Sequence, residues 1–139
     1  MKQTTRIFTY QTRGPGLTDF THHLSRWVDE VAADEGALTL MCRHTSASLT
    51  IQENADPDVQ VDLQSAMGRL APHDPRLYVH GMEGPDDMPA HIRTVLSGVT
   101  LTIPIIGRRL ALGTWQVVYL WEHRDMPHRR EIAAHLVFE

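Results

Sequence analysis

Apolar residues recur along the chain with strand spacing in some segments and helix spacing in others. Residues 3–12 alternate partially among Thr, Ile, Phe and Tyr, which predicts a first strand. Residues 20–32 then carry apolar side chains at helical spacing. Thr18 or Asp19 is suited to cap the start of this helix, and Gly36 is its predicted stop.

The middle of the chain continues with two strands and a second helix. Short apolar, β-branched runs at residues 37–43 and 47–53 predict the strands. Asp56 and Pro57 supply the N-cap and the first position of the helix. Four apolar residues at helical spacing predict a buried stripe along it, namely Val59, Leu63, Met67 and Leu70.

The last part of the chain is rich in strand signals. Residues 78–80 indicate a brief strand, and a third helix is predicted to end at Ser97, with Gly98 as its stop. Three further strands are predicted at residues 99–105, 110–124 and 130–138. Since there is no linker or internal repeat, we expect one domain over residues 1–139. Its predicted class is α+β, a sandwich with a largely antiparallel or mixed β-sheet and about three helices.

Composition narrows the classes of function. The 139 residues carry a net charge of −4 with scattered basic residues, which argues against nucleic-acid binding. Lys2 is the only lysine, so a Schiff base or a P-loop is disfavoured. Cys42 is the only cysteine, which excludes an intrachain disulfide. No apolar run is long enough to span a membrane and no signal-peptide core is present, so we expect a cytoplasmic protein with no membrane partner.

Chemistry-bearing side chains are densest in the segment HGMEGPDDMPAHI at residues 80–92. It contains two imidazoles and three carboxylates, namely His80, Glu83, Asp86, Asp87 and His91. Such groups lose hydration when they are brought together, so a cation, a ligand or helix capping must compensate. The segment predicts a ligand or metal site. The structural alternative is that the two aspartates cap the third helix and the histidines partner them.

A metal site in this segment needs a ligand from elsewhere. His80 and His91 lie eleven positions apart, which is not the spacing of a compact zinc motif. His44, at the end of the strand predicted for residues 37–43, is the obvious third ligand. Three protein ligands and one open position are typical of a catalytic zinc site. The alternative for His44 is a histidine held by a local hydrogen bond at a turn.

Polar residues just before the second helix form another candidate site. Helix N-termini favour anions, so Asn54 is a candidate donor to a phosphate or carboxylate. Glu53 is a candidate base. For Asp56, helix capping is the favoured interpretation.

Two candidates for substrate binding lie nearer the C-terminus. Gln116 is predicted on the strand face opposite to Trp115, where it can orient a substrate. Arg124, Arg129 and Arg130 offer bidentate anion binding, although a solvated charged hairpin is the favoured interpretation.

Four motifs together resemble the YjbQ-like family of small proteins. They are HTSASLTIQENADP (44–57), HGMEGPDDMPAHI (80–92), LTIPI with GR and GTWQ (101–116), and EHR (122–124). Two departures from the family pattern are Val117, where many relatives have glycine, and DMPHR at 125–129 in place of a Gly-rich turn. The first departure can narrow a pocket near Gln116.

The resemblance implies a compact α+β fold, a homotrimer and a site that holds a metal or an anion. The positions that it carries over are His44, Glu53, Asn54, Asp56, His80, Glu83, Asp86, Asp87, His91, Gln116 and Arg124. Some family members are described as secondary thiamine-phosphate synthases, so the resemblance also implies a possible transferase activity of that kind.

Two hypotheses about function follow. In the first, the protein is an enzyme acting on a phosphorylated small molecule, with a divalent metal, zinc being favoured by the imidazoles. The roles are metal binding by His44, His80 and His91, acid–base catalysis by Glu53, Glu83 and Asp87, and substrate binding by Asn54, Asp56, Gln116 and Arg124. In the second, the protein is a non-catalytic trimeric module that binds a metal or a metabolite.

Overall fold

The computed structural model describes residues 1–139 and contains eight strands and three α-helices. The strands are β1 (Lys2–Gln11), β2 (Gly16–Asp19), β3 (Glu35–Cys42), β4 (Ala47–Glu53), β5 (Thr100–Ile106), β6 (Arg109–Leu110), β7 (Gln116–Glu122) and β8 (Arg129–Phe138). The helices are α1 (Thr21–Glu30), α2 (Pro57–Leu70) and α3 (Asp87–Ser97), and a short 3₁₀ helix covers Pro75–Leu77.

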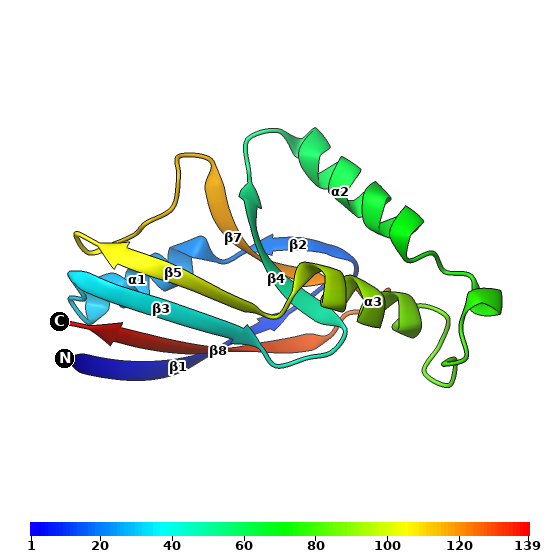
Figure 1. Cartoon of the computed structure of the whole chain (residues 1–139), viewed down its shortest axis with the longest axis horizontal. Helices are drawn as coiled ribbons and strands as arrows, with labels where there is room; N and C mark the ends of the chain where they lie inside the picture. The colour runs from blue at the N-terminus through cyan, green and yellow to red at the C-terminus, as the bar shows by residue number, and fades with distance from the viewer.

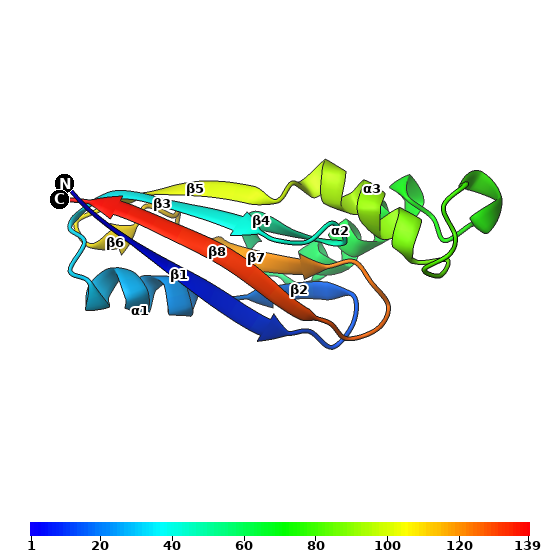
Figure 2. The same ribbon diagram turned by 90° about the horizontal axis from the view of Figure 1, so that it is seen from below.

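The strands form two antiparallel sheets that lie face to face. The larger sheet has the order β1-β8-β3-β5-β6, and the smaller has the order β2-β7-β4. Figure 1 shows α3 at one end of the sheets and α2 beyond β4. Figure 2 shows α1 below the strands, toward the other end of the molecule from α3. The predicted α+β class, with antiparallel sheets and three helices, is confirmed.

The core lies between the two sheets and is closed by α1. Strand β8 contributes every second residue to this core, as the period of a strand dictates, from Ile132 to Phe138. Helix α1 contributes Leu24 and, one turn later, Trp27 and Val28 to its buried face. The amphipathic patterns of β8 and α1 therefore explain how both elements pack into the same core.

Helix α1 ends earlier than the sequence predicts. Its last residue is Glu30, and Ala32 adopts a positive φ of 55°. The predicted stop, Gly36, is wrong, because this residue lies inside β3. A Cβ at Gly36 would stand 2.1 Å from the carbonyl oxygen of Val137 on β8, so the glycine serves a close approach of two strands.

Three further expectations about local structure are wrong. Residues 78–80 form no strand. The single strand expected at residues 110–124 is divided into β6 and β7, with no strand at residues 111–115. Strand β2 includes both candidate helix caps, Thr18 and Asp19, and it pairs with β7 from Gly16 to Asp19. The pairing partner comes about one hundred residues later in the chain, which local sequence patterns do not report.

Helix α2 begins as predicted but is not buried as predicted. The Asp56 side chain accepts a hydrogen bond from the backbone N–H of Asp58 at 2.9 Å, which confirms its capping role. No residue of α2 is buried, and Leu70, from the predicted stripe, is 66% exposed. In the isolated chain the apolar side of α2 is therefore only partly covered. No helix has both the length and the apolar character needed to cross a membrane.

Candidate functional site

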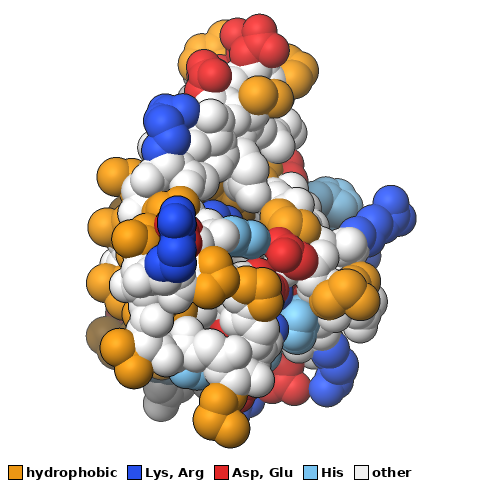
Figure 3. All heavy atoms as spheres, turned by 90° about the vertical axis from the view of Figure 1, so that its right-hand side faces the viewer, with side chains coloured by type: hydrophobic (Ala, Val, Ile, Leu, Met, Phe, Trp, Pro, Cys, Tyr) orange, Lys and Arg blue, Asp and Glu red, His pale blue; other side chains and the backbone are white.

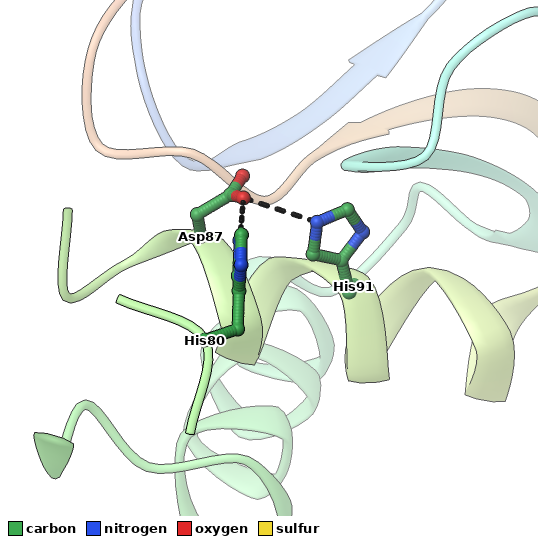
Figure 4. A group of neighbouring side chains, drawn as sticks. All are labelled: His80, Asp87 and His91. Carbon is green, nitrogen blue, oxygen red and sulfur yellow. Dashed lines mark hydrogen bonds and ion pairs between the residues drawn. The ribbon is translucent and has the colours of Figure 1, made fainter. Parts of the chain in front are cut away.

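Two histidines and one aspartate meet at the N-terminal end of α3. Asp87 Oδ2 lies 2.7 Å from His80 Nε2 and 3.0 Å from His91 Nε2 (Figure 4). Asp87 and His91 stand four residues apart on α3, so they share one helix face, and His80 comes from the preceding loop. We call these three residues the His–Asp–His group. Their candidate ligand atoms all lie within 4.8 Å of one another.

The orientation of His91 is fixed from its other ring nitrogen. Nδ1 lies 3.0 Å from the backbone carbonyl oxygen of Thr45. Because a carbonyl can only accept, the hydrogen of this bond is on Nδ1. A neutral His91 therefore directs the lone pair of Nε2 at the Asp87 carboxylate. Histidines that bind a metal usually donate their other ring N–H to a carbonyl or carboxylate oxygen in this way.

Arg124, two residues after the end of β7, supports the group. Its guanidinium contacts Asp86 at 2.8 Å and Asp87 at 2.9 Å, and it also donates to the backbone oxygen of Glu83 at 3.0 Å. Figure 3 looks at this end of the molecule and shows histidine, acidic and basic side chains close together near its middle. Since Arg124 is occupied by these partners, it holds the acidic residues in position.

The two aspartates are ionised in this setting. Burial alone would raise the pKa of Asp87, but the hydrogen bond from His80 and the charge of Arg124 outweigh it and hold the pKa below its ordinary value. Burial likewise opposes ionisation of Asp86, and hydrogen bonds from Arg124 and the N–H of Asp125 lower its pKa. A buried, ionised Asp87 is a suitable ligand for a cation.

The sequence placed Asp86 at the start of the third helix as a candidate cap. It does occupy the N-cap position of α3, but its side chain makes no capping hydrogen bond. The carboxylate instead binds Arg124 and the backbone N–H of Asp125. The capping that the structural alternative expects of Asp86 is therefore absent, but its other part is confirmed, because both His80 and His91 hydrogen-bond to Asp87.

His44 is not part of the His–Asp–His group. Its Nε2 accepts a hydrogen bond from the backbone N–H of Glu131 at 2.7 Å. The Nε2 lone pair that a metal would need is therefore occupied by this hydrogen bond from the backbone of β8. Asp87, for which the sequence predicts an acid–base role, is the third member of the group in place of His44.

Three other predicted residues lie at the far end of the smaller sheet. Glu53 and Gln116 are register partners at one end of the β4–β7 pair, whereas Glu122 is paired with the other end of β4, next to Arg124. At about 3.3 Å per residue along a strand, the two ends are roughly 20 Å apart. Asn54 donates to Asp19 at 3.3 Å at the far end. Within one chain these residues do not reach the His–Asp–His group.

The remaining predicted positions have local roles. Gln116 accepts a hydrogen bond from the backbone N–H of Gly113 at 2.8 Å, which closes the turn before β7. The Glu83 residue is exposed, and only its backbone oxygen contacts Arg124. Cys42 is buried, and its burial raises the pKa of the thiol to about 11.

Sequence reasoning missed a buried polar network that is formed by Arg130, Glu122 and Thr12. Arg130 is 4% exposed and forms an ion pair with Glu122, which also accepts from Thr12 at 2.7 Å. The solvated hairpin expected for Arg130 is therefore wrong. Nearby, the buried His123 Nε2 lies 2.8 Å from Ser48 Oγ. The continuous apolar run from Val117 to Trp121 in β7 was the only signal that the end of this strand is buried.

Known proteins of similar sequence carry the same family description. Residues 5–139 match the family described as UPF0047 protein YjbQ-like. A UPF0047 protein of Synechocystis is 48% identical over 135 residues, covering 97% of this chain and 92% of that protein. The UPF0047 protein YjbQ of Escherichia coli O157:H7 is 42% identical over 113 residues, covering 81% of each chain.

Solved structures agree with these sequence matches. A protein of the yjbq/upf0047 family from Clostridium acetobutylicum, described as uncharacterized, has a TM-score of 0.87 at 33% identity, covering 95% of this chain and 99% of its own. A hypothetical protein from Aeropyrum pernix K1 has a TM-score of 0.87 at 28% identity, covering 98% and 99%. The chain described here belongs to the YjbQ-like UPF0047 family.

Proposed function

We propose that the His–Asp–His group binds a divalent metal ion, with zinc as the favoured ion. The observation that carries this proposal is the hydrogen bond from His91 Nδ1 to Thr45. It leaves Nε2 with a lone pair that faces a carboxylate oxygen, an arrangement that is repulsive unless a cation lies between them. The alternative is an imidazolium that donates from both nitrogens.

The composition of the group fits zinc. His80 and His91 offer imidazole nitrogens and Asp87 offers a carboxylate oxygen, all on one side of the loop and helix. Zinc binds such atoms at about 2.0–2.2 Å, and three protein ligands leave one position open for a substrate or water. Asp86 and Asp87 bring two negative charges, and Arg124 brings one positive charge, so the surroundings favour a cation.

The proposed reaction is transfer or hydrolysis at a phosphorylated small molecule, and thiamine-phosphate formation is the candidate reaction. A bound divalent ion would stabilise the departing pyrophosphate. The chain itself would fix His91 through Thr45, keep Asp87 ionised through Arg124, and hold Arg124 through Asp86. These contacts preorganise the site before a substrate arrives.

A homotrimer is part of this proposal. The exposed apolar positions of α2 support it, because a helix side of this kind is usually covered by a partner. Glu53, Asn54 and Gln116 lie too far from the His–Asp–His group to act on the same substrate within one chain. They can contribute to that site only from another copy of the chain.

The enzymatic hypothesis is tested by two substitutions and one control. Zinc-loaded protein is incubated with the pyrimidine pyrophosphate and the thiazole phosphate, and thiamine phosphate and released pyrophosphate are measured. Asp87→Asn and Glu53→Gln should abolish turnover, while Asp62→Asn, an exposed aspartate on α2, should leave it unchanged. Circular dichroism checks that all three variants are folded.

The outcomes separate the two hypotheses. Wild-type rates in both Asp87→Asn and Glu53→Gln would rule out the proposed catalytic roles. Binding of zinc and substrates that stabilises the protein, with no product formed, would instead support the non-catalytic binding module.

A further inference from the structure

A pocket of about 630 Å³ lies beside the His–Asp–His group. Its walls come from the end of β3 and the residues after it, from one side of α3 and from β8. His91 belongs both to this pocket and to the proposed metal centre. The volume lies within the usual range for small-molecule sites, which is roughly 300–1,000 Å³.

The pocket combines an apolar surface with donors and carries no acid. Met41, Val95, Val99 and Ala133 provide the apolar part. Arg43, His44 and two threonines provide polar groups, and no aspartate or glutamate is among the lining residues. A lining of this kind suits a molecule that has an apolar body and an oxyanion.

His44 presents a donor whose direction is set by the fold. Since Nε2 accepts from the N–H of Glu131, the hydrogen of a neutral His44 ring is on Nδ1. Burial and the charge of Arg130 lower the pKa of His44, which keeps the ring neutral near pH 7. Nδ1 makes no hydrogen bond within the chain, and it is not among the buried atoms that lack a partner. It is therefore accessible.

Arg43 adds a positive charge at the same place. Its guanidinium contacts Glu131 at 3.1 Å, but its side chain is still 53% exposed, so further donors are available. An oxyanion between Arg43 and His44 would thus meet a charge and a fixed N–H donor, while the apolar part of the molecule covers Met41 and Val95.

We propose that this pocket binds the substrate of the metal centre, and that His44 Nδ1–H donates to a phosphate oxygen of a small molecule with an apolar body. This proposal rests on the proposed function. It changes the role of His44 from metal ligand to substrate-binding residue. Because His91 lines the pocket, the bound molecule would lie directly against the metal centre.

Phenylphosphonate is a suitable probe, since it joins an apolar ring to a phosphate-like group that is not hydrolysed. Its binding to zinc-loaded protein is measured by titration calorimetry, with benzyl alcohol as the uncharged control. Val95→Trp fills the pocket from α3, and Leu96→Trp is the matched control, because Leu96 is exposed on the same helix but does not line the pocket. The zinc content of every variant is measured in parallel.

We expect phenylphosphonate to bind more tightly than benzyl alcohol. Val95→Trp and His44→Ala should each weaken binding about tenfold or more, the second because one hydrogen bond to a charged group is lost. Leu96→Trp should bind like the wild type, and zinc content should be unchanged in all three variants. In ¹⁵N spectra of the histidine rings, the His44 Nδ1–H signal should shift when the probe is added.

The results distinguish this inference from the proposed function. Normal zinc content with no probe binding, or with binding that neither variant weakens, would overturn the pocket assignment alone. Absence of zinc would overturn the metal centre and, with it, the placing of a substrate against it. An Nε2–H tautomer for His44 would remove the proposed donor and overturn its role.

Discussion

At the scale of single residues, the most perturbed histidine is not in the His–Asp–His group. His123 is fully buried beside Ser48, and burial together with the charge of Arg93 lowers its pKa to about 3. Between about pH 6.5 and pH 3 the ring therefore stays neutral in the folded protein, whereas the unfolded chain protonates it. Such a group makes folding depend on pH.

The sign of this dependence follows from proton binding. Below pH 6.5 the unfolded His123 takes up a proton that the folded protein excludes until about pH 3, so stability is lost as the pH falls through this window. From pH 7 to pH 5 we expect the wild type to lose about 2 kcal/mol more than His123→Gln, measured by urea unfolding. Equal losses in the two proteins would contradict a neutral, buried His123.

The candidate site was only partly predictable from residue types. Asp87 and His91 are one helical turn apart, so their meeting could be foreseen from the spacing alone. The role of His44 could not, because the N–H that it accepts from belongs to Glu131 on β8, and the placement of that strand beside β3 is a long-range property. The burial of Arg130 depends on the same kind of pairing.

At the scale of elements, close strand packing explains why a glycine stands at the second position of β3. Gly36 faces Phe138 across the β3–β8 pair, and an added Cβ would collide with backbone atoms that cannot move freely. Gly68, on α2, is the matched contrast because an added Cβ there meets nothing within 4 Å.

These two glycines give opposite predictions. Gly36→Ala should destabilise the protein by about 2 kcal/mol or more, since the strands must separate. Gly68→Ala should stabilise it by roughly 0.5–1 kcal/mol, because alanine loses less backbone entropy in a helix. Thermal unfolding of both variants measures this. A tolerated Gly36→Ala would show that the two strands are not as close as the structure has them.

The elements themselves were largely predictable. Strand β4, helix α2 and helix α3 follow the sequence patterns, since caps and apolar periodicity are local signals. The end of α1 was misplaced because a glycine that serves strand packing resembles a helix stop. Strand β2 was missed because its four residues are specified by pairing with β7.

At the scale of the whole molecule, the partly covered apolar side of α2 is the feature that supports the proposed homotrimer. A trimer of 15.8 kDa chains should sediment with a mass of about 47 kDa. Leu70→Glu places a charge on the exposed apolar side of α2 and should shift the protein toward monomer, whereas Ser65→Glu, elsewhere on the same helix, should not. A monomeric wild type at micromolar concentration would contradict the proposed assembly.

The metal centre is the central claim, and elemental analysis tests it most directly. The protein is purified without a histidine tag, alongside His80→Ala/His91→Ala and the control His22→Ala/His23→Ala, which removes two neighbouring histidines of α1. We predict about one zinc or other divalent ion per chain in the wild type and the control, and none in the His80/His91 variant. A wild type that contains no metal even after incubation with zinc would contradict the account and leave His91 as an imidazolium between Asp87 and Thr45.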